Sequence, residues 1–446
     1  MLIAFSLIFA AILFLSIFNS KMNAGIPALV VVLFAVPLIP DSNVGRAATL
    51  FPTSLFLTLL GVTFFFTTLN STGLIDNLLQ RILRLFGPFP RLLPIVLFII
   101  VAALTALGLG NIATIALLAP LGIPLARQIG MSSFMMTLLL VGAANAASFS
   151  PLTLPGIFTN EFIQNSDVLR RHMQPSTMRW WIFWTVFFCI SFTTIISFFV
   201  LGGRKWLNRI STPPTTEHTA DDSVRLNRQQ KLTALLAAVL AVLFLLGCVL
   251  SLQFWEQLLN PQFLLISRRL SDVGLIGWLG SLLMIIFGLA EPEKNLKNVP
   301  WATLILVCGM STYIELLSRL GLPDAIAALV QQNIATQLLP AAFAAASALL
   351  SAFSSSVGVA LPVFMPIVQS IAQSIETSLV HSTTIAVAVG SHLVDASPLS
   401  TLGALCLAQI RDTQEQSSTY RALLIYSFCM IPVAAVVCFL LSKTIF

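Results

Sequence analysis

The sequence predicts an all-α polytopic membrane protein made of two inverted repeats, and three observations support this fold class. First, 57% of the 446 residues are hydrophobic and 9% are charged, whereas soluble domains carry about 25% charged residues. Second, apolar segments that approach the roughly 20 helical residues needed to cross a hydrocarbon core recur along the whole chain. Third, landmark residues of the first half return at nearly constant spacing in the second.

Ten apolar segments are predicted to span the membrane, five in each half. They are residues 2–18, 24–40, 50–70, 133–158 and 177–201, then residues 232–252, 272–290, 301–318, 383–408 and 421–442. The first of them lacks a basic flank and a small-residue cleavage site, so we interpret it as a retained helix. The six cysteines fall inside apolar segments without C-x-x-C spacing and are expected to be small core residues.

A polar, basic linker over residues 203–231 separates the predicted repeats, which are residues 1–202 and 232–446. The positive-inside rule places this linker in the cytoplasm. Because each half holds an odd number of spans, the two halves must lie upside down to each other in the membrane.

The spacing of shared residues supports the repeat. Ser150-Pro151-Leu152 returns 247 residues later as Ser397-Pro398-Leu399. Gly73-Leu74 returns 248 residues later as Gly321-Leu322, and Pro120 returns 246 residues later as Pro366. Such agreement between separate landmarks is not expected from chance matches of glycine and proline.

Between the third and fourth spans of each half lies an amphipathic stretch followed by a broken apolar pair. The amphipathic stretches are residues 73–87, with Asp76, Arg81 and Arg84 on a polar stripe, and residues 321–335. The broken pairs are predicted re-entrant hairpins at about 91–127, interrupted at 108–111, and at about 339–372, interrupted at 354–358. Backbone can unwind at membrane depth only where protein or a water-filled cavity satisfies its polar groups, so the two breaks predict an internal site.

The candidate site residues come from these breaks and from the two spans that contain proline. Half-helix N-termini offer N–H groups to an anion, and proline within a span frees a carbonyl. Candidate substrate-binding residues are Asn111, Ile112, Thr114, Ser150, Pro151, Thr153, Ser354, Ser355, Ser356, Ser397, Pro398, Ser400 and Thr401. Candidate ion-coupling residues are Gly110, Asn145, Ser148, Gly358, His392 and Asp395.

Simpler interpretations of these residues exist. Small residues let helices pack closely, and a proline can simply kink a helix. Asp395 could be a structural partner, although an ionisable group within a membrane segment is costly and usually functional. We expect Glu315, Asp76 and Asp324 to be interfacial charges.

Several classes of function find no support in the sequence. It has no H-E-x-x-H, Walker A or G-x-S-x-G motif and no Cys/His cluster with metal-ligand spacing, so neither an enzyme nor an ATP-driven pump is expected. The basic residues are scattered and form no basic face with interleaved aromatics, so no nucleic-acid partner is expected. No cofactor is expected beyond Na⁺ or H⁺ as a coupling ion.

Two segments resemble a known group of carriers. Residues 142–156 resemble the fourth-span signature of MatC-type dicarboxylate carriers in the ion-transporter superfamily, and Gly110-Asn111-Ile112 stands ten residues before Pro120, as the hairpin motif does in the related divalent anion:sodium symporters. The resemblance covers nearly the whole chain. The first motif lacks the usual Ser and Thr, and the second reads Ser355-Ser356-Val357.

The resemblance implies both a mechanism and a partner. Asn111 and Ser354 to Ser356 would hold substrate carboxylates, with Ser150 and Ser397 nearby, in a homodimer whose transport domain moves against a scaffold like an elevator. The expected function is secondary active transport of a small organic anion, a di- or monocarboxylate of malonate or C4 type, coupled to Na⁺ or H⁺. The departures from the motifs favour protons, with Asp395 as the coupling group.

The expected location is the cell's inner (plasma) membrane, as a multi-pass protein in contact with lipid. The alternative function is a cation/proton antiporter or an inorganic oxyanion efflux permease of the same architecture. From another class, a membrane sensor or a membrane-embedded enzyme is the remaining possibility. An enzyme would need a nucleophile or metal set that the sequence does not display.

Overall fold

The computed structural model describes the chain over eleven ranges and positions. These are residues 2–18, 23–36, 49–74, 77, 89, 91–172, 174–209, 227–250, 261–270, 272–410 and 412–444. The described residues form helices joined by turns, with no strand among them. The all-α prediction is therefore confirmed.

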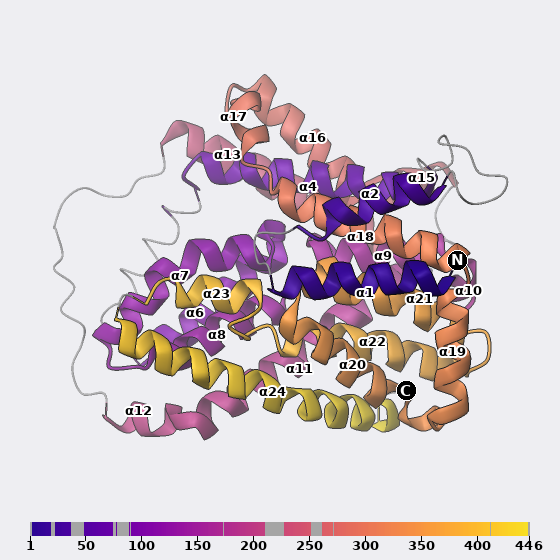
Figure 1. Cartoon of the computed structure of the whole chain (residues 1–446). Helices are drawn as coiled ribbons and strands as arrows, with labels where there is room; N and C mark the ends of the chain where they lie inside the picture. Colours follow the sequence, from indigo (N-terminus) through magenta and orange to yellow (C-terminus); the bar gives the residue numbers. More distant parts are fainter. Residues whose placement is uncertain are drawn as a thin grey trace.

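The helices of the first half, in chain order, lie as follows (Figure 1). They are α1 (Leu2–Phe18), α2 (Gly25–Ala35), α4 (Thr53–Ser71), α6 (Leu93–Leu104), α7 (Asn111–Gln128), α8 (Ser133–Ala146), α9 (Leu154–Asn165), α10 (Asp167–His172), α11 (Pro175–Phe198) and α12 (Arg204–Arg209), with wide helical turns η2 (Thr105–Leu109) and η3 (Phe199–Gly203).

The second half continues with a similar order of long and broken helices. They are α13 (Arg228–Leu250), α15 (Pro261–Leu270), α16 (Val273–Ile286), α17 (Pro292–Lys297), α18 (Trp301–Arg319), α19 (Leu322–Asn333), α20 (Leu339–Phe353), α21 (Leu361–Ile371), α22 (Thr377–Leu393), α23 (Thr401–Leu407) and α24 (Thr413–Thr444), with the short turns η4 (Thr336–Leu338) and η5 (Ser356–Ala360).

Each predicted span contains helix, and the chain is a multi-pass membrane protein. Among the described residues, five helices are long and apolar enough to cross a membrane. They are residues 53–71, 177–208, 301–319, 336–353 and 413–444. Other apolar helices, such as α2 and α8, are shorter.

The helices form two layers (Figure 1). Helices α2, α4, α13, α15, α16 and α17 lie in the upper layer of the view, and α6, α7, α8, α11, α20, α22, α23 and α24 lie in the lower one. Within the upper layer α4 packs along α16, and α2 packs along α18 at the lower side of that layer. Within the lower layer α20 packs against both α22 and α24. Helices α9 and α18 lie where the layers meet, since α4 contacts both of them.

Glycines set the closest helix contacts. A Cβ atom on Gly309 of α18 would lie 2.4 Å from the carbonyl oxygen of Gly25 on α2. A Cβ atom on Gly277 of α16 would lie 2.8 Å from the backbone of Gly61 on α4. Small residues let membrane helices approach backbone to backbone, so these glycines fix the upper layer.

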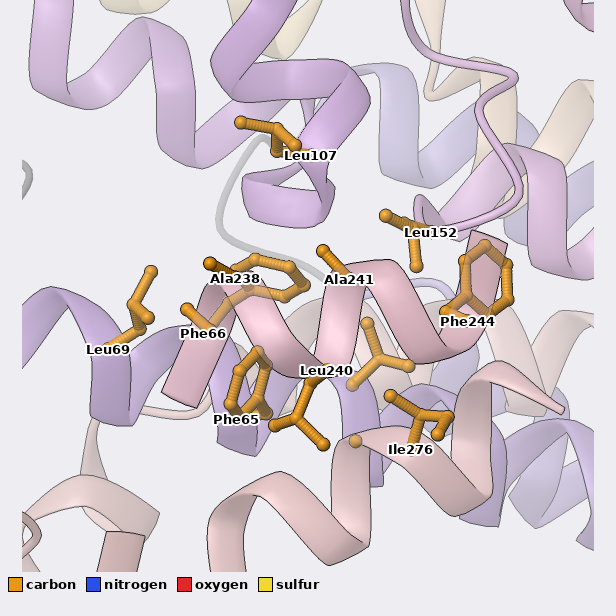
Figure 2. Close-up of a pocket in the computed structure, with 13 residues that line it drawn as sticks. Phe65, Phe66, Leu69, Leu107, Leu152, Ala238, Leu240, Ala241, Phe244 and Ile276 are labelled. Carbon is orange, nitrogen blue, oxygen red and sulfur yellow. The ribbon is translucent and has the colours of Figure 1, made fainter. Parts of the chain in front are cut away.

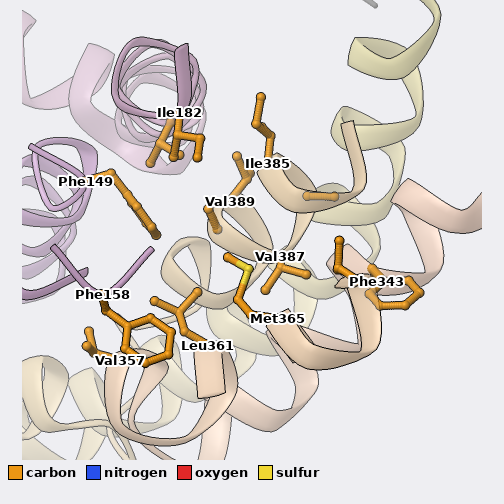
Figure 3. Close-up of a cluster of buried hydrophobic side chains, with 14 of the residues drawn as sticks. Phe149, Phe158, Ile182, Phe343, Val357, Leu361, Met365, Ile385, Val387 and Val389 are labelled. Carbon is orange, nitrogen blue, oxygen red and sulfur yellow. The ribbon is translucent and has the colours of Figure 1, made fainter. Parts of the chain in front are cut away.

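The largest apolar cluster fills the lower layer and reaches the layer boundary. Figure 3 shows Phe149, Phe158, Ile182, Leu361 and Val387 converging from α9, α11, α21, α22 and the turn after α8. Met365 at 0% and Phe149 at 1% exposure lie within it. This packing joins α9, α20, α21 and α22, which flank three of the four broken segments described below.

The structure refines three expectations. The fourth and ninth spans, predicted as continuous, are each two helices separated by an unwound stretch, α8 and α9 around residues 147–153 and α22 and α23 around residues 394–400. The linker over 203–231 is helical at both ends, in α12 and at the start of α13, and residues 210–226 lie outside the described part. Cys429, expected in the core, is exposed, whereas Cys308, Cys406 and Cys438 are buried.

The structure describes most of one predicted amphipathic stretch and little of the other. Helix α19 occupies most of residues 321–335, with Asp324 exposed in its first turn. Of residues 73–87 only Gly73, Leu74 and Asn77 are described, so Asp76, Arg81 and Arg84 lie outside the described residues. The division into inverted repeats, the re-entrant placement of the hairpins and the cytoplasmic linker stay predictions.

Candidate functional site

The first hairpin breaks between α6 and α7 at two glycines. Gly108 has φ 107° and Gly110 has φ 81°, a region that side chains other than glycine rarely adopt. A Cβ atom on Gly108 would also lie 2.2 Å from the ring of Phe66 on α4. The sequence Gly-Leu-Gly therefore ends one helix and lets α7 restart at Asn111.

Asn111 and Thr114 stabilise the start of α7. The Oδ1 atom of Asn111, which is 6% exposed, accepts from the N–H of Ile112 at 2.9 Å. The Thr114 hydroxyl donates to the carbonyl of Gly110 at 2.7 Å. We call residues Gly108 to Ile112 the first tip.

The second hairpin breaks at a run of serines. Ser354 adopts an extended conformation after α20, and its hydroxyl donates to the Leu350 carbonyl at 2.6 Å. Ser355 caps η5, because its Oγ accepts from the N–H of Gly358 at 3.1 Å. A serine N-cap satisfies a backbone donor that the helix itself cannot. We call residues Ser354 to Gly358 the second tip.

The unwound stretch between α8 and α9 is held by its own hydroxyls. Ser148 donates to the Asn145 carbonyl at 2.7 Å, and Thr153 donates to the carbonyls of Ser150 and Ser148. The Ser150 hydroxyl reaches across to the Ala106 carbonyl in the first hairpin at 2.5 Å. Pro151 is buried between these residues and has no N–H to satisfy.

The unwound stretch between α22 and α23 repeats this arrangement. Ser400 donates to the carbonyls of Ser397 and Asp395, as Thr153 does in the first half. The Ser397 hydroxyl reaches across to the Ala352 carbonyl in the second hairpin at 2.8 Å. Each hairpin is thus tied to the unwound stretch of its own half by one serine next to a proline.

Asp395 is the buried carboxyl group of this region, with 3% exposure. Ser351 of α20 donates to its Oδ1 at 2.9 Å, and Ser356 of the second tip donates to its Oδ2 at 2.5 Å. Among the described residues no Lys, Arg or His forms an ion pair with it. A buried carboxylate without a basic partner is costly, so a proton or a bound cation would neutralise it.

His392 lies one turn before Asp395 and is 1% exposed. Its Nδ1 lies 3.0 Å from the Ser391 hydroxyl, and its ring stands edge-on to Phe149 with centroids 4.6 Å apart. Its Nε2 has no hydrogen-bond partner within the described part of the chain. His392 and Asp395 are not hydrogen-bonded to each other through their side chains, so they act as two separate groups.

Asn145 joins the two halves. Its Oδ1 accepts from the Nδ2 of Asn111 at 3.2 Å, and its own Nδ2 donates to the backbone carbonyl of His392 at 2.9 Å. At 1% exposure it has no access to bulk water. This carboxamide therefore links the first tip to the second half by hydrogen bonds.

A cavity of about 260 Å³ opens at the first tip. It is lined by Gly108, Leu109, Gly110, Asn111, Ile112 and Ala113 of the hairpin, by Leu59, Val62 and Thr63 of α4, by Leu152, Leu154 and Ile157, and by Pro300 and Thr303. Among the described residues, its lining holds the polar side chains of Asn111, Thr63 and Thr303 and no charged one. The N-terminus of α7 supplies its positive potential.

A second, larger cavity of about 510 Å³ lies further along α4 and α9. Glu161 of α9 and Glu315 of α18 line it, together with polar residues of both helices and prolines of α21. Leu55 and Phe158 also line it, whereas their neighbours along the same helices, Leu59 and Ile157, line the first cavity. The cavities thus lie in sequence along the boundary between the layers.

A third cavity, of about 230 Å³, is apolar (Figure 2). Phe65 and Phe66 of α4 and Leu240 and Phe244 of α13 line it, and Leu107 of the first hairpin and Leu152 close one side. Without a polar side chain in its lining it offers nothing to a carboxylate.

The structure brings several predicted residues together in two groups. Gly110, Asn111, Ile112, Asn145 and Ser150 gather at the first tip, and Ser356, Gly358, Asp395 and Ser397 gather at the second. Thr401 is instead exposed at the start of α23.

Sequence reasoning missed Ser351, which bonds Asp395, and Thr63 and Thr303, which line the first cavity. Ser351 stands three residues before the predicted break at Ser354, and that spacing could have identified it. Glu315, expected at the interface, pairs with Arg319 at 2.9 Å and faces the second cavity.

Comparison with protein families gives one match. A family model described as a citrate transporter, CitMHS, matches residues 3–442 of this chain. A search of curated proteins found no match.

Proposed function

Because the chain belongs to the citrate transporter family, we propose that it is a secondary active carrier of a small organic anion, with a tri- or dicarboxylate as substrate. Citrate is the first candidate from the family description, and malonate and C4 dicarboxylates are the next. The single observation that carries this proposal is the cavity at the first tip, where Asn111 and the N-terminus of α7 meet.

The chemistry of that cavity suits a carboxylate. The first N–H groups of an α-helix have no partner within the helix and carry a partial positive charge. Asn111 adds a carboxamide donor, and Thr303 adds a hydroxyl from the facing side, whereas the Thr63 hydroxyl donates to the Leu59 carbonyl at 2.7 Å. A site that relies on neutral donors binds an anion without a fixed counter-charge, which suits a carrier that must also release it.

Asp395 is the proposed coupling group. The buried carboxylate is held by two hydroxyls and faces no basic side chain among the described residues. Occupation by H⁺ or Na⁺ would neutralise it. The Ser356 hydroxyl belongs to the second tip, so loading of this group changes the contacts of that tip.

We propose that alternating access arises from movement of one layer against the other. We place the carrier in the cell's inner (plasma) membrane, surrounded by lipid, as a homodimer whose lower layer moves against the upper one. The two cavities at the layer boundary support this arrangement, because the boundary is where a moving layer would open a route to the first tip.

The proposal is tested by thermal unfolding of the purified protein against citrate, malonate, succinate, phosphate and arsenate, in sodium or potassium, at two pH values. A ligand that binds the folded state raises its stability, by about 2.7 kcal/mol at a hundredfold excess over Kd. Stabilisation by one carboxylate supports the proposal. A protein that no carboxylate stabilises but that responds to oxyanions, cations or pH contradicts it.

A second candidate is cation/proton antiport or oxyanion efflux by the same architecture. The observation that favours it is the Asp395 carboxyl group, because the two serines that donate to it belong to the second hairpin and not to the first tip. If this second candidate is correct, the thermal stability of the protein should still respond to cations or pH after the first tip is altered.

A further inference from the structure

A continuous set of hydrogen bonds joins the two tips. It begins at the Ile112 N–H, passes through Asn111 and Asn145, and reaches the carbonyl of His392. The same carbonyl accepts from the N–H of Asp395 at 3.5 Å, and Asp395 accepts from Ser356 of the second tip. We call Asn111, Asn145, His392, Asp395 and Ser356 the tip-to-tip chain.

Asn145 is the point at which this chain crosses between the halves. It accepts from the first half with Oδ1 and donates to the second with Nδ2, so one rigid carboxamide makes both contacts. Its acceptor His392 stands 247 residues later, the spacing of the Ser-Pro-Leu landmark. In the predicted repeat, Asn145 thus contacts its own counterpart, which only residues near the axis between the repeats can do.

Burial makes the chain sensitive to movement. Asn111 is 6% exposed, Asn145 and His392 are each 1% exposed, and Asp395 and Ser356 are 3% and 4% exposed. A buried donor or acceptor that loses its partner without water costs about 1–3 kcal/mol. If the Asn145 amide rotates to follow Asn111, it therefore breaks or strains its bond to the His392 carbonyl. If it rotates to follow that carbonyl, it breaks or strains its bond to Asn111.

We propose that Asn145 is the positioning residue that couples occupancy of the first tip by the anion to occupancy of the Asp395 site by the cation or proton. This inference rests on the proposed function for the identity of the two ligands. A ligand that draws the Asn111 amide toward the cavity releases Asn145, and the loop that carries Asp395 readjusts. Coupling between two sites acts equally in both directions.

Calorimetric binding of citrate tests the coupling with four proteins: wild type, Ser356→Ala, Asn145→Ser and the double variant. Ser356→Ala removes one hydroxyl from Asp395 without touching the first tip. We expect it to change the citrate Kd by at least about fivefold, the lower end of typical couplings. When Asn145→Ser is already present, adding Ser356→Ala should alter the citrate Kd by less than about twofold.

The control is Thr384→Val in α22, since Thr384 is buried and its hydroxyl donates to the Val380 carbonyl of its own helix. It should leave the effect of Ser356→Ala intact. Equal effects of Ser356→Ala with and without Asn145 would overturn the proposal.

Amide hydrogen exchange tests the tip-to-tip chain without any ligand, and thus separates its failure from that of the proposed function. Asn111→Ala cuts the first contact and leaves Asn145 in place. Exchange at residues 354–360 and 394–400 should become at least about fivefold faster, because protection reports local opening. Thr384→Val should not have this effect. Unchanged exchange at both segments in Asn111→Ala would overturn the proposal even if citrate binds.

Discussion

At the scale of single residues, hydroxyl and carboxamide side chains replace the hydrogen bonds that four helix breaks remove. Ser150 and Ser397 each bond a carbonyl of the neighbouring hairpin, and Thr153 and Ser400 each bond two carbonyls of their own loop. Unsatisfied backbone groups cost several kcal/mol in an apolar medium. These residues therefore determine whether the unwound segments can exist at all.

Asn111→Ala should weaken substrate binding. The substitution removes a donor at the N-terminus of α7, and a hydrogen bond to a charged group contributes about 1.5–3 kcal/mol. We expect the citrate Kd to rise at least about tenfold, measured by calorimetry, in a variant that still folds but has a lower thermal midpoint, because the buried Asn145 loses a partner. Asn333→Ala at the exposed end of α19 is the matched control. Unchanged affinity would remove Asn111 from the site.

Asp395→Asn should abolish the response to the coupling ion. The carboxamide keeps the shape of the side chain, and its Oδ1 can still accept from one of the two serines while its Nδ2 donates to the hydroxyl oxygen of the other, but it cannot take up a proton or neutralise Na⁺. The change of citrate affinity with pH and with sodium should disappear. Asp324→Asn, exposed on α19, should retain it. The same dependence in Asp395→Asn would assign Asp395 a structural role.

At the scale of elements, the two hairpins break by different means. The first uses glycines at positive φ, and the second uses an extended serine and a serine cap. Glycine supplies the conformation directly, whereas serine stabilises it through hydrogen bonds. The first tip therefore depends on the absence of side chains, and the second depends on hydroxyls.

Gly108→Ala should destabilise the first hairpin. The new Cβ atom would lie 2.2 Å from the Phe66 ring at a φ of 107°. Overpacking costs about 1–3 kcal/mol, and a left-handed conformation for a non-glycine residue costs roughly 1–2 kcal/mol more. Thermal unfolding should show a clear loss of stability. Gly130 has φ 66°, and a Cβ atom added there would have no atom within 4 Å. Gly130→Ala should therefore cost only the roughly 1–2 kcal/mol of the left-handed conformation. Equal losses would show that Phe66 moves freely.

At the scale of the whole molecule, the sequence predicted the helices well and their internal breaks less well. Apolar length located every described span, and Gly108 to Asn111 and Ser354 to Gly358 marked the hairpin breaks. The breaks after α8 and α22 were predicted only as sites of proline. A proline can kink a helix or interrupt it, and the outcome depends on hydroxyl partners such as Ser148 and Ser400, which local sequence does not reveal.

Some site residues could be predicted from the sequence, and others could not. Asn111 and Asp395 could be chosen from sequence because polar groups within apolar segments are costly. The contact of Asn145 with His392 could not, since it joins residues 247 positions apart. Ser351, Thr63 and Thr303 look like ordinary small polar residues of apolar helices until the fold places them beside the tips.

A cross-link between the layers should stop transport. The Ser54 hydroxyl of α4 donates to Glu161 of α9 at 3.2 Å across the layer boundary. Cysteines at both positions, in a variant without the native cysteines, should be bridged by Hg²⁺. We expect citrate uptake into proteoliposomes to stop and to return after excess thiol removes the Hg²⁺ by ligand exchange, with binding retained. Each single cysteine is the control. Uptake that continues in the bridged protein would contradict relative movement of α4 and α9.

The absence of charged side chains from the lining of the first cavity bears on energetics across the membrane. A polycarboxylate bound there would bring its whole charge into the transmembrane field. Each uncompensated elementary charge moved through 100 mV changes the free energy by about 2.3 kcal/mol. Membrane voltage would therefore oppose uptake into a negative interior unless cations travel in the same cycle, and the number of those cations sets the steepest gradient that the carrier can build.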